Sequence, residues 1–386
     1  MTIKFPIYMD YHATTPVDPR VLESMLPYFS EKFGNASSID HLYGLWAEEA
    51  VESAREKVAK IINARPDEII FTSGATESDN LALVGVMEKF SQKGDHLITC
   101  VTEHKAILDT AKKLEEKGKK VTFLPVDQYG MVNPEDVASS ITDKTVLISI
   151  MTANNEIGTI APIQEIGRIA HDHGVLFHTD AAQAVGHIPI DVNKMNIDLL
   201  SMSAHKIYGP KGIGALFIKG RNPKGKLTPQ MSGGGQERGV RSGTLNVPGI
   251  VGFGTALEIA AKEMKDENIR FRKWTSQMYQ SFCEFHDDVK LNGHPTHRLA
   301  HNLNVSFGGI ESKALLHLIR NELAISAGSA CTTTSVEPSH VLKAIGLSER
   351  YLFSAVRFGL GRFNSEEEIE DSINIIIKSI QKLYKI

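Results

Sequence analysis

Short apolar runs of β-strand type, separated by helical patterns, are the feature that most limits what this chain can fold into. Each run is continuously apolar, which is typical of parallel strands buried on both faces, and the helical patterns between them would cover those faces. The pattern therefore predicts an α/β fold with a mainly parallel, seven-stranded sheet. The runs cover residues 69–71, 97–101, 121–126, 146–150, 175–177, 199–202 and 215–218. Their uneven spacing favours an open sheet, and a TIM barrel is the alternative.

The length of 386 residues predicts roughly two domains. We expect a large domain over residues 15–257 and a smaller α+β domain formed by residues 1–14 and 258–386. A charged, helix-like connector at 258–272 would open the smaller domain. The rest of that domain is expected to contain a strand at 302–307, a helix at 313–323, a strand before Arg357 and a closing helix at 366–383.

Charge and apolar patterning disfavour several classes of partner. The formal net charge is -4 and no run of lysine and arginine stands out, so neither nucleic acid nor an anionic membrane surface is an expected partner. The first residues lack the apolar core of a signal peptide, and no apolar run approaches the ~20 residues that span a bilayer. We therefore expect a cytoplasmic protein. The three cysteines, Cys100, Cys283 and Cys331, lie far apart, which argues against disulfides and a metal site.

A lysine and an aspartate follow two neighbouring runs of the predicted sheet. Lys206 comes after the run at 199–202 and before a glycine-rich turn, and Asp180 ends the stretch 175–180 that begins with the preceding run. Either residue alone would more often be exposed, but parallel strands bring both to one edge. Pyridoxal phosphate needs this pair: an amine to hold its aldehyde, and an anion to keep its ring nitrogen protonated.

Other strand ends supply further candidates, because ligands of open parallel sheets bind beyond the carboxyl ends of the strands. Small and hydroxyl residues at the start of a helix suit a phosphate, although most such sequences are plain caps and Thr76 with Asp79 resembles a capping box. A histidine at such a position could stack on a ring or move a proton, and amides could bind cofactor or substrate oxygens. The candidates are Ala75, Thr76, His104, Asn155, Gln183, Ser203 and His205.

Two further segments have unusual composition. Residues 232–244 form a glycine-rich stretch with Arg238 and Arg241, suited to closing over an anionic cofactor or, alternatively, to a disordered surface loop. Cys331 lies among small and hydroxyl residues, whereas free cysteines are usually buried in apolar segments. Its surroundings favour an accessible, reactive thiolate.

Together these motifs resemble the cysteine desulfurases of the NifS and IscS type, which are class V pyridoxal-phosphate enzymes of fold type I. The resemblance covers nearly the whole chain. It rests on residues 10–16, 33–35, 72–80, 102–104, 154–158, 180–183, 203–214, 241–247, 328–331 and 357–362.

The resemblance implies a role for each candidate. Lys206 would hold the cofactor, Asp180 would pair with its ring nitrogen, and His104 would stack on the ring and assist proton transfer. Gln183 would meet the phenolic oxygen of the ring, and Cys331 would carry the persulfide. The phosphate would be bound by Ala75, Thr76, Ser203 and His205, and by Thr244 from a second subunit. Asn155 and Arg357 would hold the substrate carboxylate.

The activity implied by the resemblance is removal of sulfur from L-cysteine, giving alanine and a persulfide on Cys331. Implied partners are a second copy of the chain and a sulfur acceptor such as an iron–sulfur scaffold protein. The sequence leaves two alternatives open: a selenocysteine lyase or other class V lyase or aminotransferase, and a non-catalytic scaffold. Cys331 favours the desulfurase, because a transaminase has no use for it.

Overall fold

A seven-stranded sheet is the centre of the computed structural model, which describes residues 5–327 and 338–383. Within these residues the strand order is β2-β8-β7-β6-β5-β3-β4, and all neighbours are parallel except β8, which runs antiparallel to β2 and β7. The sheet is open, with β2 and β4 as its edges, so the predicted fold class is confirmed and the barrel alternative is wrong. The strands are β2 (Ile69–Thr72), β3 (His96–Cys100), β4 (Lys120–Leu124), β5 (Thr145–Ser149), β6 (Leu176–Asp180), β7 (Leu199–Ser203) and β8 (Gly214–Ile218).

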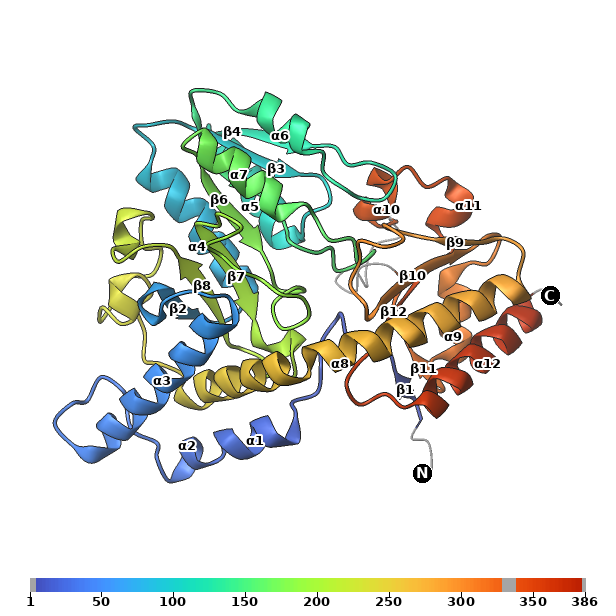
Figure 1. The fold of residues 1–386 in the computed structure, drawn as a ribbon, viewed down its shortest axis with the longest axis horizontal. Helices are drawn as coiled ribbons and strands as arrows, with labels where there is room; N and C mark the ends of the chain where they lie inside the picture. The colour runs from blue at the N-terminus through green and yellow to red at the C-terminus, as the bar shows by residue number, and fades with distance from the viewer. Residues whose placement is uncertain (1–4, 328–337, 384–386) are drawn as a thin grey trace.

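Helices cover both faces of this sheet, as its apolar strands predict (Figure 1). Successive side chains of a strand point to opposite faces: Ile70 packs in the core under α4 and α5, whereas Ile69 and Phe71 pack in the core under α3 and α8. The helices around the sheet are α3 (Leu42–Ile61), α4 (Ala75–Lys89), α5 (Lys105–Glu116), α6 (Pro134–Ser140), α7 (Ile163–Asp172) and α8 (Val247–Phe285).

A smaller antiparallel sheet has the order β12-β10-β9 and its own apolar core, which contains Phe282, Phe307 and Phe358. Arg357 lies inside β12, not after a strand, and the helix expected at 313–323 ends earlier. The elements here are β1 (Ile7–Tyr8), β9 (Val289–Leu291), β10 (Asn302–Phe307), α9 (Ser312–Ile319), β11 (Leu323–Ala324), α10 (His340–Ala344), α11 (Glu349–Leu352), β12 (Ala355–Gly359) and α12 (Glu366–Leu383).

Helix α8 joins the two sheets and runs from beneath the larger one to the smaller one (Figure 1). Its 39 residues combine the apolar run before residue 258 and the charged connector after it into one helix. Phe253 and Leu257 pack in the core of the large sheet, and Phe271 and Trp274 pack in the core of the small one. A domain boundary at residue 257 stays a prediction, because α8 crosses it without a break.

Helices α1 (Pro19–Met25) and α2 (Pro27–Ser30) precede α3 and lie below α8 in the view of Figure 1. In the described part of the chain, no helix combines the length and the apolar character that crossing a bilayer requires.

Candidate active site

A cavity of about 620 Å³ opens where several strands of the large sheet end. The turns after β2, β3, β5, β6 and β7 all contribute to its wall, as the rule for open parallel sheets predicts. Ten predicted site residues line it: Ala75, Thr76, His104, Asn155, Asp180, Gln183, Ser203, His205, Lys206 and Arg357.

Lys206 ends a short 3-10 turn, Ala204–Lys206, that directly follows β7. Tyr208, two residues later, adopts a left-handed backbone with φ of 66° in the connection that leads to β8. The Lys206 Nζ donates hydrogen bonds to the backbone oxygens of His12 at 2.5 Å and Ala13 at 2.8 Å. The amine is therefore held at the cavity wall by the N-terminal segment.

Asp180 ends β6 and lies beside Lys206, because β6 and β7 are parallel neighbours. Its Oδ1 accepts a hydrogen bond from the Ala182 N–H at 2.9 Å. Burial raises the pKa of this carboxyl group, and the charges of His104 and Lys206 act in the opposite direction. A cationic ring nitrogen facing Asp180 would further favour the ionised form.

The N-terminus of α4 provides a site suited to an anion. The helix begins after Gly74, whose φ of 150° favours glycine, and no side chain among the described residues caps it. The capping box suggested by Thr76 and Asp79 is therefore not formed, and the first N–H groups of the helix stay available to a phosphate. Ser203 and His205 line the same cavity. Burial, with Lys206 and Lys211, lowers the pKa of His205 to about 4, so its imidazole is neutral.

The ring-facing candidates come from the turns after β3, β5 and β6. His104 is the N-cap of α5, and its Nδ1 accepts the Ala106 N–H at 3.2 Å, which fixes the ring orientation. Gln183 is held by His12: its Oε1 lies 3.0 Å from His12 Nδ1, and its Nε2 donates to the His12 backbone oxygen at 3.0 Å. Asn155 lines the cavity between the two sheets.

Arg357 reaches the cavity from β12 and is almost completely buried. Its Nη2 pairs with Asp10 at 2.7 Å and with the Ser326 hydroxyl at 3.2 Å, and its Nη1 donates to the Asn155 backbone oxygen at 2.9 Å. The Nε has no hydrogen-bond partner among the described residues. The guanidinium is thus fixed in place at the cavity wall.

Sequence reasoning assigned no role to several cavity residues. His12, Ala13 and Thr14 line the cavity although they lie far from the other motifs in sequence. The motif at 10–16 was the signal that marked them, but their partners depend on how the N-terminal segment packs against the turn after β7 and against β12. Glu103 was also overlooked: it is buried behind the site, and its Oε2 has no partner among the described residues.

The glycine-rich segment 232–244 does not line the cavity. Thr244 is exposed and does not line the cavity of its own chain. Cys331 lies outside the described residues. Arg238 and Arg241 do not line the cavity either: Arg241 instead pairs with Glu77 at 2.8 Å, at the start of α4.

The donor set fits pyridoxal phosphate. The cavity offers a primary amine, a buried carboxylate, an uncapped helix N-terminus and a fixed guanidinium, and these match the aldehyde, ring nitrogen and phosphate of the cofactor and the carboxylate of an amino acid.

Comparisons with known proteins agree with this geometry. The model of the aminotransferase class-V family matches residues 7–371. The cysteine desulfurase IscS of Anaeromyxobacter dehalogenans (strain 2CP-C) is 53% identical over 381 residues, which cover 99% of this chain and 94% of that protein. A solved NifS-like protein superposes with a TM-score of 0.91 at 39% identity, covering 97% of this chain and 99% of the other. A solved structure of SspA in complex with cysteine gives 0.80 at 40% identity, covering 93% and 99%.

Proposed function

The chain belongs to the aminotransferase class-V family, and on that premise we propose that it is a cysteine desulfurase whose reaction takes place in the cavity around Lys206. This proposal rests on one observation: a single cavity is lined by Lys206, Asp180, His104 and Arg357. The activity is the one for which its relatives are named, and the cofactor is pyridoxal phosphate.

The residues at the cavity wall would hold the cofactor. Lys206 would bind its aldehyde, Asp180 would face its ring nitrogen, and Gln183 would donate to its phenolic oxygen. Ala75, Thr76, Ser203 and His205 would bind its phosphate with the N-terminus of α4. When bound, the cofactor draws electrons from the α-carbon of the substrate and so weakens the bond to its sulfur.

Arg357 and Asn155 would orient the substrate. The fixed guanidinium binds the carboxylate of L-cysteine, and its pairing with Asp10 keeps it from turning away. Lys206, once released from the cofactor, would take the α-proton, and His104 would assist proton transfer. Both side chains line the cavity and are anchored by backbone groups, which limits their motion during the reaction.

Cys331 would receive the sulfur. Its thiolate attacks the sulfur of the substrate, so that a sulfur–sulfur bond forms while the carbon–sulfur bond breaks. The electron pair of the broken bond takes up a proton, alanine leaves, and Cys331 keeps a persulfide. An acceptor protein, such as an iron–sulfur scaffold, would then collect this sulfur.

A second copy of the chain would complete the site. Thr244 is exposed and outside the cavity, so its expected contact with the cofactor phosphate requires a neighbouring subunit. Several exposed large apolar side chains between α1 and α3 support a homodimer, because exposed apolar surface marks interaction sites. We call this set the α1–α3 patch; it consists of Leu26, Phe29, Phe33, Ile39, Leu42 and Trp46. Location in the cytoplasm stays a prediction.

The test of this function is one turnover with isotopically labelled cysteine, followed by mass spectrometry of the protein. We expect Cys331 to gain one sulfur and alanine to form in equal amount. Cys331→Ala should keep the absorbance of the bound cofactor and lose sulfur transfer, whereas Cys283→Ala, a half-buried thiol of α8, should behave like the original protein. Unchanged sulfur transfer by Cys331→Ala would refute the assignment.

A further inference from the structure

A second, smaller cavity of about 230 Å³ lies between α8 and the segment that leads into β10. Among the residues that the structure describes, it shares none with the cavity around Lys206. Its wall contains two arginines and several hydroxyl groups, and no aspartate or glutamate is among the described residues that line it. The polar residues of the wall are Arg272, Thr275, Ser276, Tyr279, Thr296, Arg298 and Asn302.

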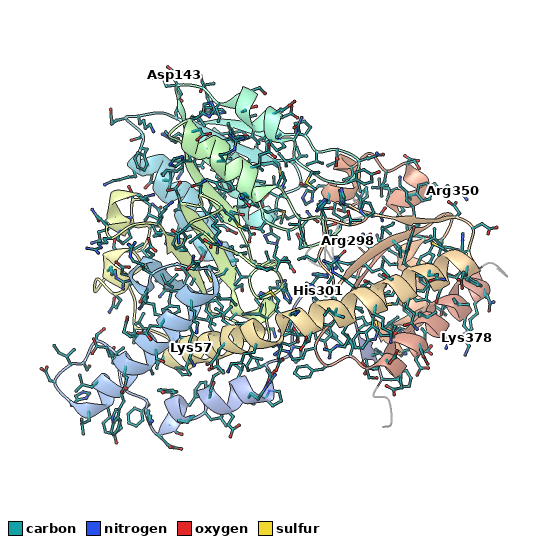
Figure 2. All side chains as sticks on the ribbon, in the orientation of Figure 1. Lys57, Asp143, Arg298, His301, Arg350 and Lys378 are labelled. Carbon is teal, nitrogen blue, oxygen red and sulfur yellow. The ribbon has the colours of Figure 1, made fainter. Side chains whose placement is uncertain are left out.

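Arg298 is a buried cation with only neutral partners among the described residues. Its side chain donates to the Asn292 backbone oxygen at 3.3 Å and to the Asn302 Oδ1 at 2.9 Å, and no described carboxylate lies within ion-pair distance. Burial lowers the pKa of Arg298 to about 10, which still leaves the group charged at neutral pH. Arg298 and the neighbouring His301 lie near the middle of the molecule, over α8 (Figure 2).

The other buried arginines in the described part of the chain form ion pairs, and Arg298 forms none there. Buried charges are normally compensated, since an unpaired ion in the interior is costly. An anion in the cavity would supply the missing counter-charge at Arg298, and the exposed Arg272 at the rim would attract it. The paired cases are Arg55 with Glu237, Arg357 with Asp10, and Arg362 with Asp18 and Glu267.

A chain of hydrogen bonds leads from Arg298 to the cofactor site. Arg298 donates to Asn302 Oδ1, and the Asn302 amide donates to His12 Nε2 at 3.1 Å and to the Glu156 backbone oxygen at 3.1 Å. Because His12 Nε2 accepts, the proton of this ring is on Nδ1, which donates to Gln183 Oε1 at 3.0 Å. All donors therefore point the same way, from Arg298 toward Gln183.

His12 stays neutral within this series of hydrogen bonds. A neutral imidazole is required, because one ring nitrogen must accept a hydrogen bond while the other donates one. Burial lowers its pKa well below the usual value, and the nearby charge of Arg357 acts in the same direction. The ring is also held by stacking on His301, with centroids 4.4 Å apart. Hydrogen bonds aligned in this way polarise one another, so a change of charge at Arg298 alters how strongly Gln183 donates.

We propose that the cavity at Arg298 binds a small oxyanion, of the phosphate or carboxylate class, and that Asn302 and His12 transmit its presence to Gln183. The site is separate from substrate binding. Its occupant would tune the cofactor through the hydrogen bond at the phenolic oxygen.

Binding is tested on the cofactor-loaded enzyme, in which the cofactor already fills its own phosphate site. The melting temperature is measured against inorganic phosphate, sulfate and acetate at constant ionic strength held with chloride. We expect the melting temperature to rise saturably with at least one of the three anions. The order of their affinities separates a phosphate site from a carboxylate site. Arg298→Gln should weaken binding about tenfold or more, because hydrogen bonds to charged groups are among the stronger ones.

Arg272→Gln provides a second variant in case Arg298→Gln does not fold, since Arg272 is exposed. It should weaken binding by a smaller factor, and Arg320→Gln, an exposed arginine outside the cavity wall, should leave it unchanged. The site is overturned if the folded enzyme shows no saturable response to any of the anions, or if Arg272→Gln and the folded Arg298→Gln titrate like the original protein.

The effect of anion binding at Arg298 on Gln183 is tested by the absorbance of the bound cofactor during a pH titration without cysteine. Neutralising Arg298 weakens the donors that support an anionic phenolic oxygen, so saturating anion should raise the apparent pKa of the chromophore. Asn302→Ala should abolish this shift. A shift that persists in Asn302→Ala, or its absence in the original enzyme when anion is bound, would overturn the relay while leaving the desulfurase function untouched.

Discussion

Lys206 and the N-terminal segment are coupled at the level of single atoms. The Lys206 Nζ uses the backbone oxygens of His12 and Ala13 as acceptors, so the residues that hold this amine are themselves part of the cavity wall. The same segment holds Gln183 through His12 and Arg357 through Asp10. A short stretch of chain thereby orients the amine, the amide and the guanidinium of the site.

Replacement of Lys206 by alanine tests its assigned role. We expect turnover of cysteine to fall by about 10²–10⁴-fold or more, the range for loss of a positioned proton-transfer group. Borohydride reduction should no longer attach the cofactor to the protein, which peptide mass mapping would show. Lys117→Ala, at the exposed C-terminal end of α5, is the matched control and should keep both properties. Covalent labelling that persists in Lys206→Ala would contradict the assignment.

Glu103 should make the stability of the cofactor-free protein depend on pH. Burial raises its pKa from 4.5 to about 8. Between these values the folded state keeps the proton that the unfolded state has lost, so the free energy of unfolding should fall by about 1.4 kcal/mol per pH unit as pH rises. The effect is absent below 4.5 and levels off above about 8.

Glu103→Gln should remove this contribution, which urea unfolding at several pH values from 5 to 8 can measure. The variant should gain stability relative to the original protein as pH rises. Glu115→Gln, an exposed change on α5, controls for loss of a carboxylate in general. An identical pH slope for Glu103→Gln and the original protein would show that Glu103 does not hold its proton in the folded state.

At the scale of elements, the glycine-rich segment 232–244 is anchored to the sheet and to α3. Arg55 of α3 and Glu237 form a buried ion pair at 2.8 Å, with exposed side-chain fractions of 4% and 1%. Glu237 also accepts the Phe71 N–H of β2 at 2.7 Å. Composition alone left open whether this stretch is a disordered surface loop, and these contacts give it defined positions.

Breaking this pair should destabilise the protein strongly. Arg55→Met leaves Glu237 buried without its counter-ion, so we expect the free energy of unfolding to fall by about 3–5 kcal/mol in urea titrations. Adding Glu237→Gln removes the isolated charge and keeps an acceptor for Phe71, so the double variant should recover a large part of the loss. A double variant as unstable as the sum of both single changes would show that the charge is not the cause.

At the scale of the whole molecule, the site is expected to be complete only in a dimer. Leu42→Glu together with Phe33→Glu places charges in the α1–α3 patch, where both side chains are more than half exposed, at 62% and 63%. Sedimentation should show a shift from dimer to monomer. Cofactor affinity should fall about tenfold or more, because the phosphate loses a charge-assisted hydrogen bond from Thr244.

Phe353→Glu, an exposed aromatic change near α11, is the control and should leave the dimer intact. A double variant that remains dimeric would rule out the α1–α3 patch as the interface. A monomer that binds the cofactor with full affinity would contradict the assigned contact of Thr244.

The amino-acid sequence by itself determined the large sheet and the residues at the carboxyl ends of its strands. Strand type, strand order along the chain and the helices between them follow from local apolar patterns, and parallel strands must end together, so Lys206 and Asp180 meet whatever the rest of the chain does. The turns after the other strands carried Thr76, His104 and Asn155 to the same cavity for that reason.

Only the tertiary structure decided how the N-terminal segment and the smaller sheet complete the site. The pairing of Arg357 with Asp10, the contact of Lys206 with His12, and the isolation of Arg298 all join or separate residues far apart in sequence. Such contacts depend on how two cores pack across α8, and no local pattern encodes that packing. That Arg298 has no counter-ion among the described residues can be recognised only when the positions of the neighbouring side chains are known.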